Sequence, residues 1–170
     1  MSEGRAGDAS DGRAAVITIS TSASRGDRED TGGPALESFA RGLGVEVVGR
    51  EVIPDERELI EGRLRWWCDE GGCELLLTTG GTGFGRYDVT PEATRAVIDR
   101  EAPGLAEAMR AASREHTRHW MLSRAVAGIR ERTVIVNFPG NPASIEQAGA
   151  AIAGALPHAL ALLAGRPTRH

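Results

Sequence analysis

The chain has 170 residues, of which 41% are hydrophobic but only 4% aromatic, so it is long enough for one domain with a core of Ala, Val, Leu and Ile. A net charge of -4 gives no reason to expect a nucleic acid partner, and no apolar run is long enough to cross a bilayer. Residues 1–12 are polar and lack the apolar core of a signal peptide. We therefore expect a disordered tail over residues 1–12, one folded domain over residues 13–170 and a cytoplasmic location.

Apolar runs and helical patterns alternate along the chain. The apolar runs predict strands at 14–20, 45–53, 73–79 and 133–138 and favour a short edge strand at 125–131. The helical patterns predict helices at 34–43, 55–70, 91–100, 103–114 and 142–163. Strands that alternate with helices indicate βαβ crossovers. We therefore predict an α/β fold, a single-domain three-layer sandwich with a mostly parallel sheet.

Unusual loops follow four of the predicted strands. They are polar or rich in glycine, and they occupy residues 20–33, 53–58, 78–88 and 139–144. In an open parallel α/β sheet, ligands bind outside the carboxyl ends of the strands. Because those ends share one edge, we expect the four loops to converge on one rim and to form the binding site there.

The segment TTGGTGFG, at residues 78–85, places four glycines in six positions directly after a predicted strand. Without Cβ atoms, successive backbone N–H groups approach an anion closely, and the threonine hydroxyls add donors. The segment is not a Walker A loop, since Arg86 and Tyr87 stand in place of Lys and Ser/Thr, and it lacks the spacing of the dinucleotide fingerprint. It predicts a cradle for phosphate or another anionic group, with a flexible turn as the alternative.

Two aspartates border these loops. Asp88 is not needed as a helix cap, because Thr90 is a good N-cap and Pro91 a good first helical residue. Asp55 is followed by Glu58 in the pattern of a capping box, so it has both a capping and a functional interpretation. An acid beside a phosphate cradle repels the ligand unless a divalent cation intervenes, and Mg²⁺ binds carboxylate and phosphate oxygens together. The two acids therefore indicate a magnesium site.

Three segments, TTGGTGFGRYDVTPEAT, IPDERELI and LSRAVAGIRERTVIVNFPGNPASIE, resemble the motifs of the molybdopterin-binding MogA/MoaB family, and the resemblance runs over roughly residues 14–165. Active members of that family are molybdopterin adenylyltransferases of molybdenum cofactor biosynthesis. The resemblance implies that molybdopterin attacks the α-phosphate of Mg-ATP through its own phosphate, giving adenylylated molybdopterin and pyrophosphate. It also implies Mg²⁺ as the cofactor, ATP and molybdopterin as substrates, a homotrimer and a partner protein that inserts molybdate.

The resemblance further assigns residues to the site. Asp55 and Asp88 correspond to the two functional acids of the family, with catalytic and metal-binding roles. The residues that it assigns to the binding of the pterin and the nucleotide are Ser20, Thr79, Gly80, Gly81, Thr82, Gly83, Ser123, Pro139, Gly140, Asn141 and Pro142. From the residues alone, Asn141 and Pro142 match an N-cap and a first helical residue equally well.

The chain departs from the family pattern in two places. Thr21 stands where relatives commonly carry the first acid of the loop after the first strand, and Asp30 fits the later acid of that loop. The chain also lacks the insertion that some adenylyltransferases carry before the last helix, so it resembles the compact MoaB-like branch. A molybdopterin-binding or assembly subunit without catalysis is therefore the alternative to the enzyme.

Overall fold

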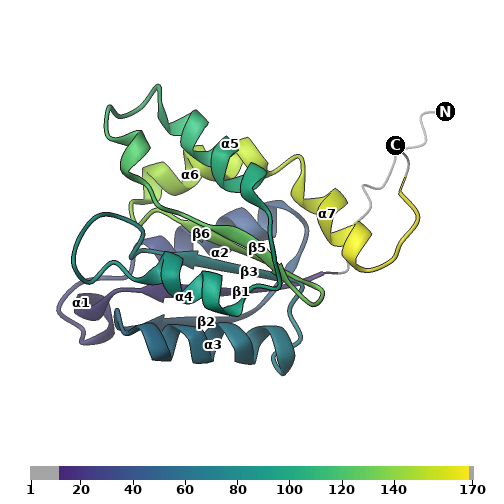
Figure 1. Ribbon diagram of the computed structural model, residues 1–170, viewed down its shortest axis with the longest axis horizontal. Helices are drawn as coiled ribbons and strands as arrows, with labels where there is room; N and C mark the ends of the chain where they lie inside the picture. The colour runs from purple at the N-terminus through teal and green to yellow at the C-terminus, as the bar shows by residue number, and fades with distance from the viewer. Residues whose placement is uncertain (1–11, 169–170) are drawn as a thin grey trace.

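The computed structural model describes residues 12–168, so the predicted tail, apart from Gly12, lies outside the described residues. Its strands are β1 (Arg13–Ile19), β2 (Glu46–Ile53), β3 (Leu75–Thr79), β4 (Arg100–Glu101), β5 (Ala127–Arg130) and β6 (Thr133–Phe138). Its helices are α1 (Thr21–Ser24), α2 (Gly32–Gly42), α3 (Arg57–Asp69), α4 (Thr90–Val97), α5 (Pro103–Ser113), the 3-10 turn η1 (Trp120–Leu122), α6 (Pro142–Ile152) and α7 (Leu156–Leu163). Figure 1 shows these elements around one central sheet.

The sheet has six strands in the order β2-β1-β3-β6-β5-β4. The first four of these strands run parallel, while β5 pairs antiparallel with β6 and with β4. The predicted mostly parallel sheet is therefore confirmed. Because β1, β2, β3 and β6 run the same way, their carboxyl ends lie at one edge of the sheet.

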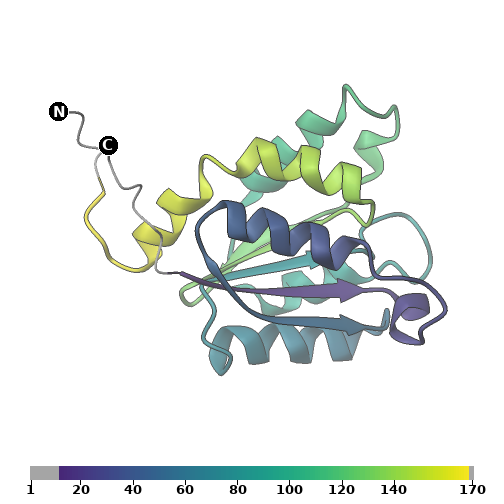
Figure 2. The same cartoon turned by 180° about the vertical axis from the view of Figure 1, so that it is seen from behind.

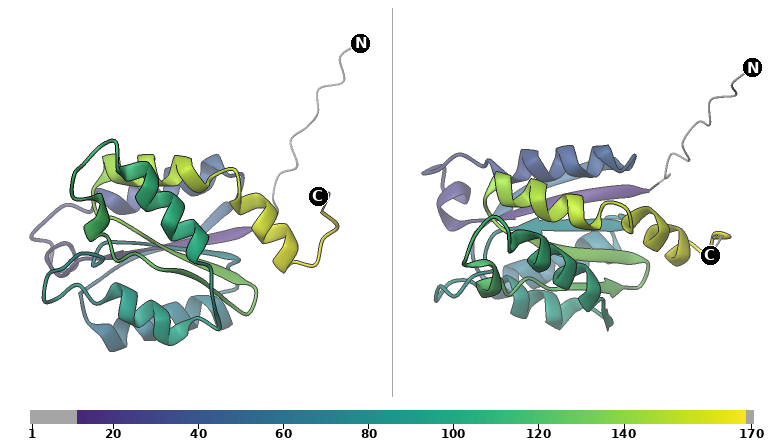
Figure 3. Two further views of the ribbon diagram at one scale, coloured as in Figure 1. Left: turned by 45° about the horizontal axis from the view of Figure 1, so that its top comes forward. Right: turned by 90° about the horizontal axis from the view of Figure 1, so that it is seen from above.

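Helices cover both faces of the sheet, which confirms the three-layer sandwich (Figures 1 and 2). On one face, alternate residues of β1, β3 and β6 pack against α2, α5, α6 and α7. On the other face, the intervening residues pack against α3 and α4. The view from above in Figure 3 shows α2, α5 and α6 lying over the same side of the strands. No helix within residues 12–168 is long and apolar enough to cross a membrane.

The elements differ from the expected ones at three places. The helix expected at 91–100 ends at Val97, because Asp99 N donates to Ile129 O at 2.8 Å and the chain continues as the edge strand β4. The single helix expected at 142–163 is divided into α6 and α7, since Pro157 has no N–H to continue the ladder. The short helix α1 lies in a stretch expected to be a loop, and Ser20 caps it by accepting from Ala23 N.

A buried polar network joins three elements below the carboxyl edge. Asn137 on β6 is fully buried, and its Nδ2 donates to Thr78 Oγ1 on β3 and Thr94 Oγ1 on α4, each at 3.0 Å. Its Oδ1 accepts from Val126 N at 3.1 Å. Every polar atom of this side chain thus has a partner, which buried amides require. The network therefore holds α4 in one position against the sheet.

We expect Asn137→Ala to lower the free energy of unfolding by about 2–4 kcal/mol. The substitution leaves the buried Val126 N–H without an acceptor and removes the donor that binds the Thr78 and Thr94 hydroxyls. Urea unfolding of the purified variant measures this. Thr133→Val is the matched control, since Thr133 is also buried but donates a single hydrogen bond, to Cys73 O. The control is expected to lose only about 1 kcal/mol. Equal losses in the two variants would show that the network contributes no more than one ordinary bond.

Candidate functional site

The four loops expected to converge on one rim do so. Ser20 N, after β1, donates to Ile53 O at the end of β2 at 2.9 Å. Gly80 N, after β3, donates to Phe138 O at the end of β6 at 3.2 Å. Hydrogen bonds between neighbouring strand ends therefore bring together loops that lie far apart in the sequence.

A cleft of about 370 Å³ opens at this rim. It has the size of a small-molecule site, and polar and apolar surface contribute about equally to its lining. Six of the residues assigned to ligand binding line it: Ser20, Thr79, Gly80, Gly140, Asn141 and Pro142. Lining residues that the sequence analysis did not assign to ligand binding include Thr18, Arg28, Glu29 and Asp30. Three of these four belong to the loop after β1, where the family pattern had matched Asp30 but gave no signal for Arg28 or Glu29.

Three of the cleft residues also have structural roles. Asn141 caps α6, since its Oδ1 accepts from Ala143 N at 2.9 Å, and Pro142 is the first residue of that helix. The hydroxyl of Thr79 donates to Pro139 O at 2.7 Å. Because that proton is already used within the protein, the Thr79 hydroxyl offers a ligand its oxygen lone pairs and no donor.

The chain turns sharply after β3. Gly80 and Gly81 have φ values of +97° and +67°, in the left-handed region that favours glycine. A Cβ on Gly80 would lie 2.3 Å from Ile19 O, and a Cβ on Gly81 would lie 2.3 Å from Thr90 Oγ1. Thr90 is not the expected N-cap. It is the first residue of α4, and its hydroxyl donates to Gly80 O at 3.0 Å.

The turn leaves backbone donors without a partner in the protein. Among residues 12–168, the N–H groups of Gly81, Thr82 and Gly83 donate no hydrogen bond. Three successive free N–H groups beside a left-handed turn are a suitable surface for an anion. The turn thus has unpaired backbone N–H groups of the kind that an anion cradle requires, and the cradle itself stays a prediction.

Asp55 is held by the loop after β1 and does not cap α3. Its Oδ2 accepts from both the backbone N and the hydroxyl of Thr21, each at 3.0 Å, and Asp55 N donates back to Thr21 Oγ1 at 3.0 Å. The N-cap of α3 is Glu56, so the capping interpretation of Asp55 is wrong. Thr21 stands where relatives commonly carry an acid, and here its backbone N and hydroxyl bind the carboxylate of Asp55. Oδ1 of Asp55 faces Gly81, whose Cβ would lie 3.2 Å from it.

Asp88 lies on the other side of the glycine turn. Its Oδ2 accepts from Gly85 N at 2.8 Å, and its own N donates to Gly85 O at 3.0 Å, so it is not the uncommitted acid that the sequence suggested. Within residues 12–168, the hydrogen bonds of the Asp55 and Asp88 carboxylates use only Oδ2. Each acid therefore has one carboxylate oxygen without a hydrogen-bond partner in that part of the chain, and carboxylate oxygens are a ligand type that Mg²⁺ takes together with phosphate oxygens.

One residue that the sequence analysis did not assign reaches the glycine loop from a remote segment. Arg124 donates Nε to Gly83 O and Nη2 to Asp88 O, each at 2.7 Å, and its Nη1 binds Glu92. The guanidinium holds the pKa of Glu92 below its usual range through this hydrogen bond. Thirty-six positions separate Arg124 from Asp88, so no local pattern in the sequence could reveal the contact.

The remaining assigned residues lie outside the cleft. Ser123 and Pro139 line a second hollow of about 130 Å³ that is bordered by α5 and η1. Thr82 is buried, and its carbonyl accepts from Arg124 N at 2.8 Å. The assigned residues therefore form three neighbouring groups, namely the cleft, the turn between the two acids and this second hollow.

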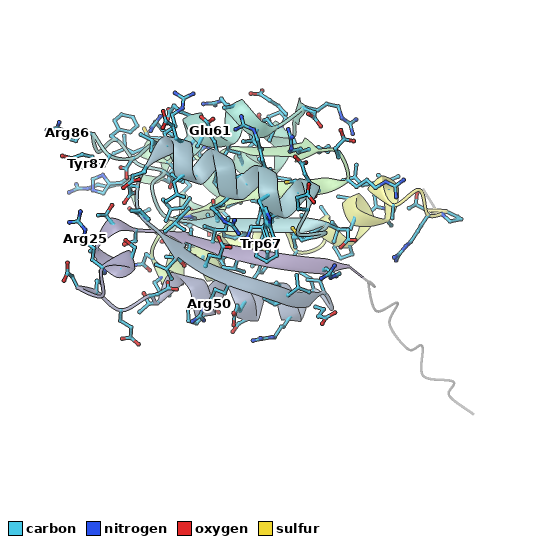
Figure 4. All side chains as sticks on the ribbon, turned by 90° about the horizontal axis from the view of Figure 1, so that it is seen from below. Arg25, Arg50, Glu61, Trp67, Arg86 and Tyr87 are labelled. Atoms are coloured by element: carbon cyan, nitrogen blue, oxygen red, sulfur yellow. The ribbon has the colours of Figure 1, made fainter. Side chains whose placement is uncertain are left out.

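Exposed side chains with charge or aromatic rings mark the outer edge of the rim. Figure 4 shows Arg25, Arg86 and Tyr87 at the same end of the molecule. The Arg86 guanidinium lies 5.0 Å from the centre of the Tyr87 ring. A larger hollow of about 720 Å³ lies away from the acids, between α2 and α6, and its lining is mainly apolar.

Comparison with known proteins places this geometry among relatives. Residues 15–158 match the family described as "Probable molybdopterin binding domain". The chain is 46% identical over 138 residues to the molybdopterin adenylyltransferase of Escherichia coli K12, a match that covers 79% of this chain and 70% of that protein. It is 39% identical over 153 residues to the molybdenum cofactor synthesis protein cinnamon of Drosophila melanogaster, covering 87% of this chain but 25% of that longer protein.

Solved structures agree with the sequence relatives. The molybdopterin biosynthesis enzyme MoaB from Thermus thermophilus superposes on this chain with a TM-score of 0.86 at 44% identity. The match covers 93% of this chain and 99% of that one. The compact chain length is thus shared with this solved structure.

We expect Asp55→Asn to retain the fold, because the amide oxygen still accepts from both donors of Thr21. The free energy of unfolding should change by less than about 1 kcal/mol, whereas Asp55→Ala, which removes both bonds, should cost about 1–3 kcal/mol. Chemical unfolding of the two variants beside the wild type measures the difference. Equal losses in Asn and Ala would show that the link to Thr21 does not stabilise the rim.

Proposed function

The chain belongs to the molybdopterin-binding domain family, and from that membership we propose that it is a molybdopterin adenylyltransferase of molybdenum cofactor biosynthesis that uses Mg-ATP. One observation carries the proposal. The free N–H groups of Gly81, Thr82 and Gly83 are bracketed by the carboxylates of Asp55 and Asp88, each with one oxygen unused among residues 12–168. Donors for an anion and ligands for a cation therefore lie side by side.

This arrangement suits phosphoryl-type transfer. Such reactions need positioning and charge neutralisation more than a protein nucleophile, and no nucleophilic side chain is required of the rim. The backbone donors of the glycine turn bind the phosphate of molybdopterin and orient one of its oxygens toward the α-phosphate of ATP. Asp55 and Asp88 would hold Mg²⁺, which when bound would neutralise charge on the triphosphate. The oriented phosphate oxygen forms the new bond to the α-phosphorus as the bond from that phosphorus to the α–β bridging oxygen breaks, and pyrophosphate leaves with the bridging oxygen.

In this proposal the cleft residues bind the pterin and the nucleotide. Gly140 presents no side chain, so a flat ring or a phosphate approaches the backbone between β6 and α6 closely. Ser20 and Thr18 also line the cleft, and the Thr18 hydroxyl, which donates to Asp30 Oδ1 at 3.0 Å, offers a ligand only its oxygen lone pairs. Ser123 and Pro139, in the adjoining hollow, form the outer part of the same ligand path. In this proposal the cleft positions the substrate, the glycine turn binds its phosphate, and the two acids hold the cation.

Several finer expectations stay predictions. They are the homotrimer, the partner that inserts molybdate and the cytoplasmic location. The second candidate function is a molybdopterin-binding subunit without catalysis. It is favoured by one observation, that Thr21 supplies a hydroxyl to Asp55 where relatives commonly carry another acid. Turnover separates the two candidates directly.

We expect the purified protein to release pyrophosphate from ATP when molybdopterin and Mg²⁺ are present. Asp88→Asn should lower the rate by at least about a hundredfold, because it removes a charge that binds the cation. A rate loss of this order is found when one electrostatic contact to the transferring group is lost. The variant should still bind molybdopterin. Binding without any pyrophosphate release by the wild type would support the non-catalytic subunit and contradict the enzyme.

Gly140→Ala tests the cleft. The nearest atom to its added Cβ is Gly80 Cα at 3.8 Å, an ordinary contact, so the fold should be unaffected. Affinity for molybdopterin, measured by calorimetric titration, should fall at least about tenfold, which corresponds to roughly 1.4 kcal/mol. Gly154→Ala is the control, because an added Cβ meets nothing within 4 Å and the position lies between α6 and α7. Equal affinity in both variants would place the ligand elsewhere.

A further inference from the structure

The outer part of the glycine loop depends on one side chain. Residues 83–88 include four exposed positions, and their internal contacts are the turn between Gly85 and Asp88 and the stacking of Arg86 on Tyr87. Within residues 12–168, every hydrogen bond that joins residues 83–88 to the rest of the protein comes from Arg124. This arginine therefore ties the segment that carries Asp88 to the body of the domain.

Arg124 is itself fixed at both ends. Its backbone N donates to Thr82 O at 2.8 Å, and its guanidinium forms an ion pair with Glu92 in the first turn of α4. Glu92 follows Thr90, whose hydroxyl holds Gly80. The planar fork of an arginine suits such a set of acceptors, because its five N–H groups point in fixed directions and it stays charged at all ordinary pH values. One guanidinium thus joins the loop, the helix start and the segment before β5.

The contacts determine where the Asp88 carboxylate lies. The Arg124 guanidinium donates hydrogen bonds to the carbonyls of Gly83 and Asp88, which are the two ends of the outer loop. Between them, Asp88 N donates to Gly85 O and Gly85 N donates to the carboxylate, so the side chain is part of the same turn. A displacement of the Asp88 backbone therefore moves the carboxylate with it.

We propose that Arg124 is a positioning residue that holds the outer glycine loop so that the Asp88 carboxylate faces the cation of the nucleotide. The inference rests on the proposed function for the identity of that cation. The role of Arg124 in holding the loop does not depend on the proposed function. Arg124 touches no reacting atom in this scheme. It acts through Asp88, by two backbone carbonyls and an ion pair with Glu92.

The first test needs no activity. In Arg124→Ala, backbone amide exchange at Gly85 and Asp88 should become at least about tenfold faster, the scale of change expected when hydrogen bonds from a charged donor are lost. Trypsin should also cleave faster after the exposed Arg86. Arg124→Lys keeps the charge without the fork and should give intermediate exchange and cleavage, so the test survives if the Ala variant folds poorly. Exchange like that of the wild type in either folded variant would overturn the proposal.

The second test concerns the reaction. Arg124→Ala should lower kcat and raise the Mg²⁺ concentration needed for half-maximal pyrophosphate release at least about tenfold, because one of the two cation ligands is misplaced. The affinity for molybdopterin should fall less than the Mg²⁺ requirement rises, by no more than about threefold, since two of its three donors keep their supports: Thr90 still binds Gly80 and Gly81, and the backbone N of residue 124 still binds Thr82 O. Guanidinium ion added well below unfolding concentrations should restore part of the rate. An unchanged Mg²⁺ requirement would contradict positioning through Asp88.

Arg130 provides a matched control on the same segment of chain. It donates Nε and Nη2 to the carboxylate of Asp69 and Nη1 to Val97 O, so it too joins an acid and a backbone carbonyl. It lies beside Thr133 at the amino end of β6, on the opposite edge of the sheet from the site. Arg130→Ala should lose stability without changing loop exchange or the Mg²⁺ requirement. Equal effects in the two variants would reduce Arg124 to a general structural role.

Failure of the inference and failure of the proposed function give different results. If the wild type releases no pyrophosphate, the enzyme is contradicted, but faster exchange at Gly85 and Asp88 in Arg124→Ala still supports the loop-holding role. If the wild type is active and the exchange is unchanged, the inference alone is overturned.

Discussion

The close approach of two strand ends is the constraint on which the site depends. The chain leaving β3 passes so near the end of β1 that a Cβ on Gly80 would lie 2.3 Å from Ile19 O. Only glycine fits there, and its positive φ turns the following residues away from the strand direction. The turn brings Gly81 against Thr90 and Asp55, and it leaves three N–H groups without an acceptor in the described chain. The unpaired N–H groups of this turn are therefore a consequence of how closely the two strand ends approach.

The interior supports this turn from below. Asn137 joins β6, β3 and α4 through hydrogen bonds that are fully buried, so α4 cannot slide along the sheet without leaving polar groups unpaired. Thr90 is the first residue of α4, and its hydroxyl holds Gly80. The core network contacts α4 at Thr94, and the rim turn contacts the same helix one turn earlier, at Thr90. Stability and the geometry of the site are coupled through that helix.

Much of the fold was decided by the sequence alone. Alternating apolar runs and helical patterns specify a parallel α/β sandwich because strand and helix periods differ, and the loops after parallel strands necessarily meet at one edge. The glycines of residues 80–85 indicated an anion site because bare backbone lets N–H groups approach an anion closely, with a flexible turn as the alternative. The resemblance of several separated motifs pointed to the molybdopterin-binding family, which the comparisons confirmed.

The partners of individual side chains were decided only by the tertiary structure. The sequence offered Asp55 as a cap, Asp88 as uncommitted and Thr90 as an N-cap, since local patterns describe only neighbours along the chain. In the fold, Asp55 finds Thr21 thirty-four positions away, and Asp88 is held by Arg124 thirty-six positions away. Contacts of this range depend on strand order and on which loops the sheet brings together. A hydrogen bond needs both atoms within about 3 Å, and no periodicity in the sequence carries that information.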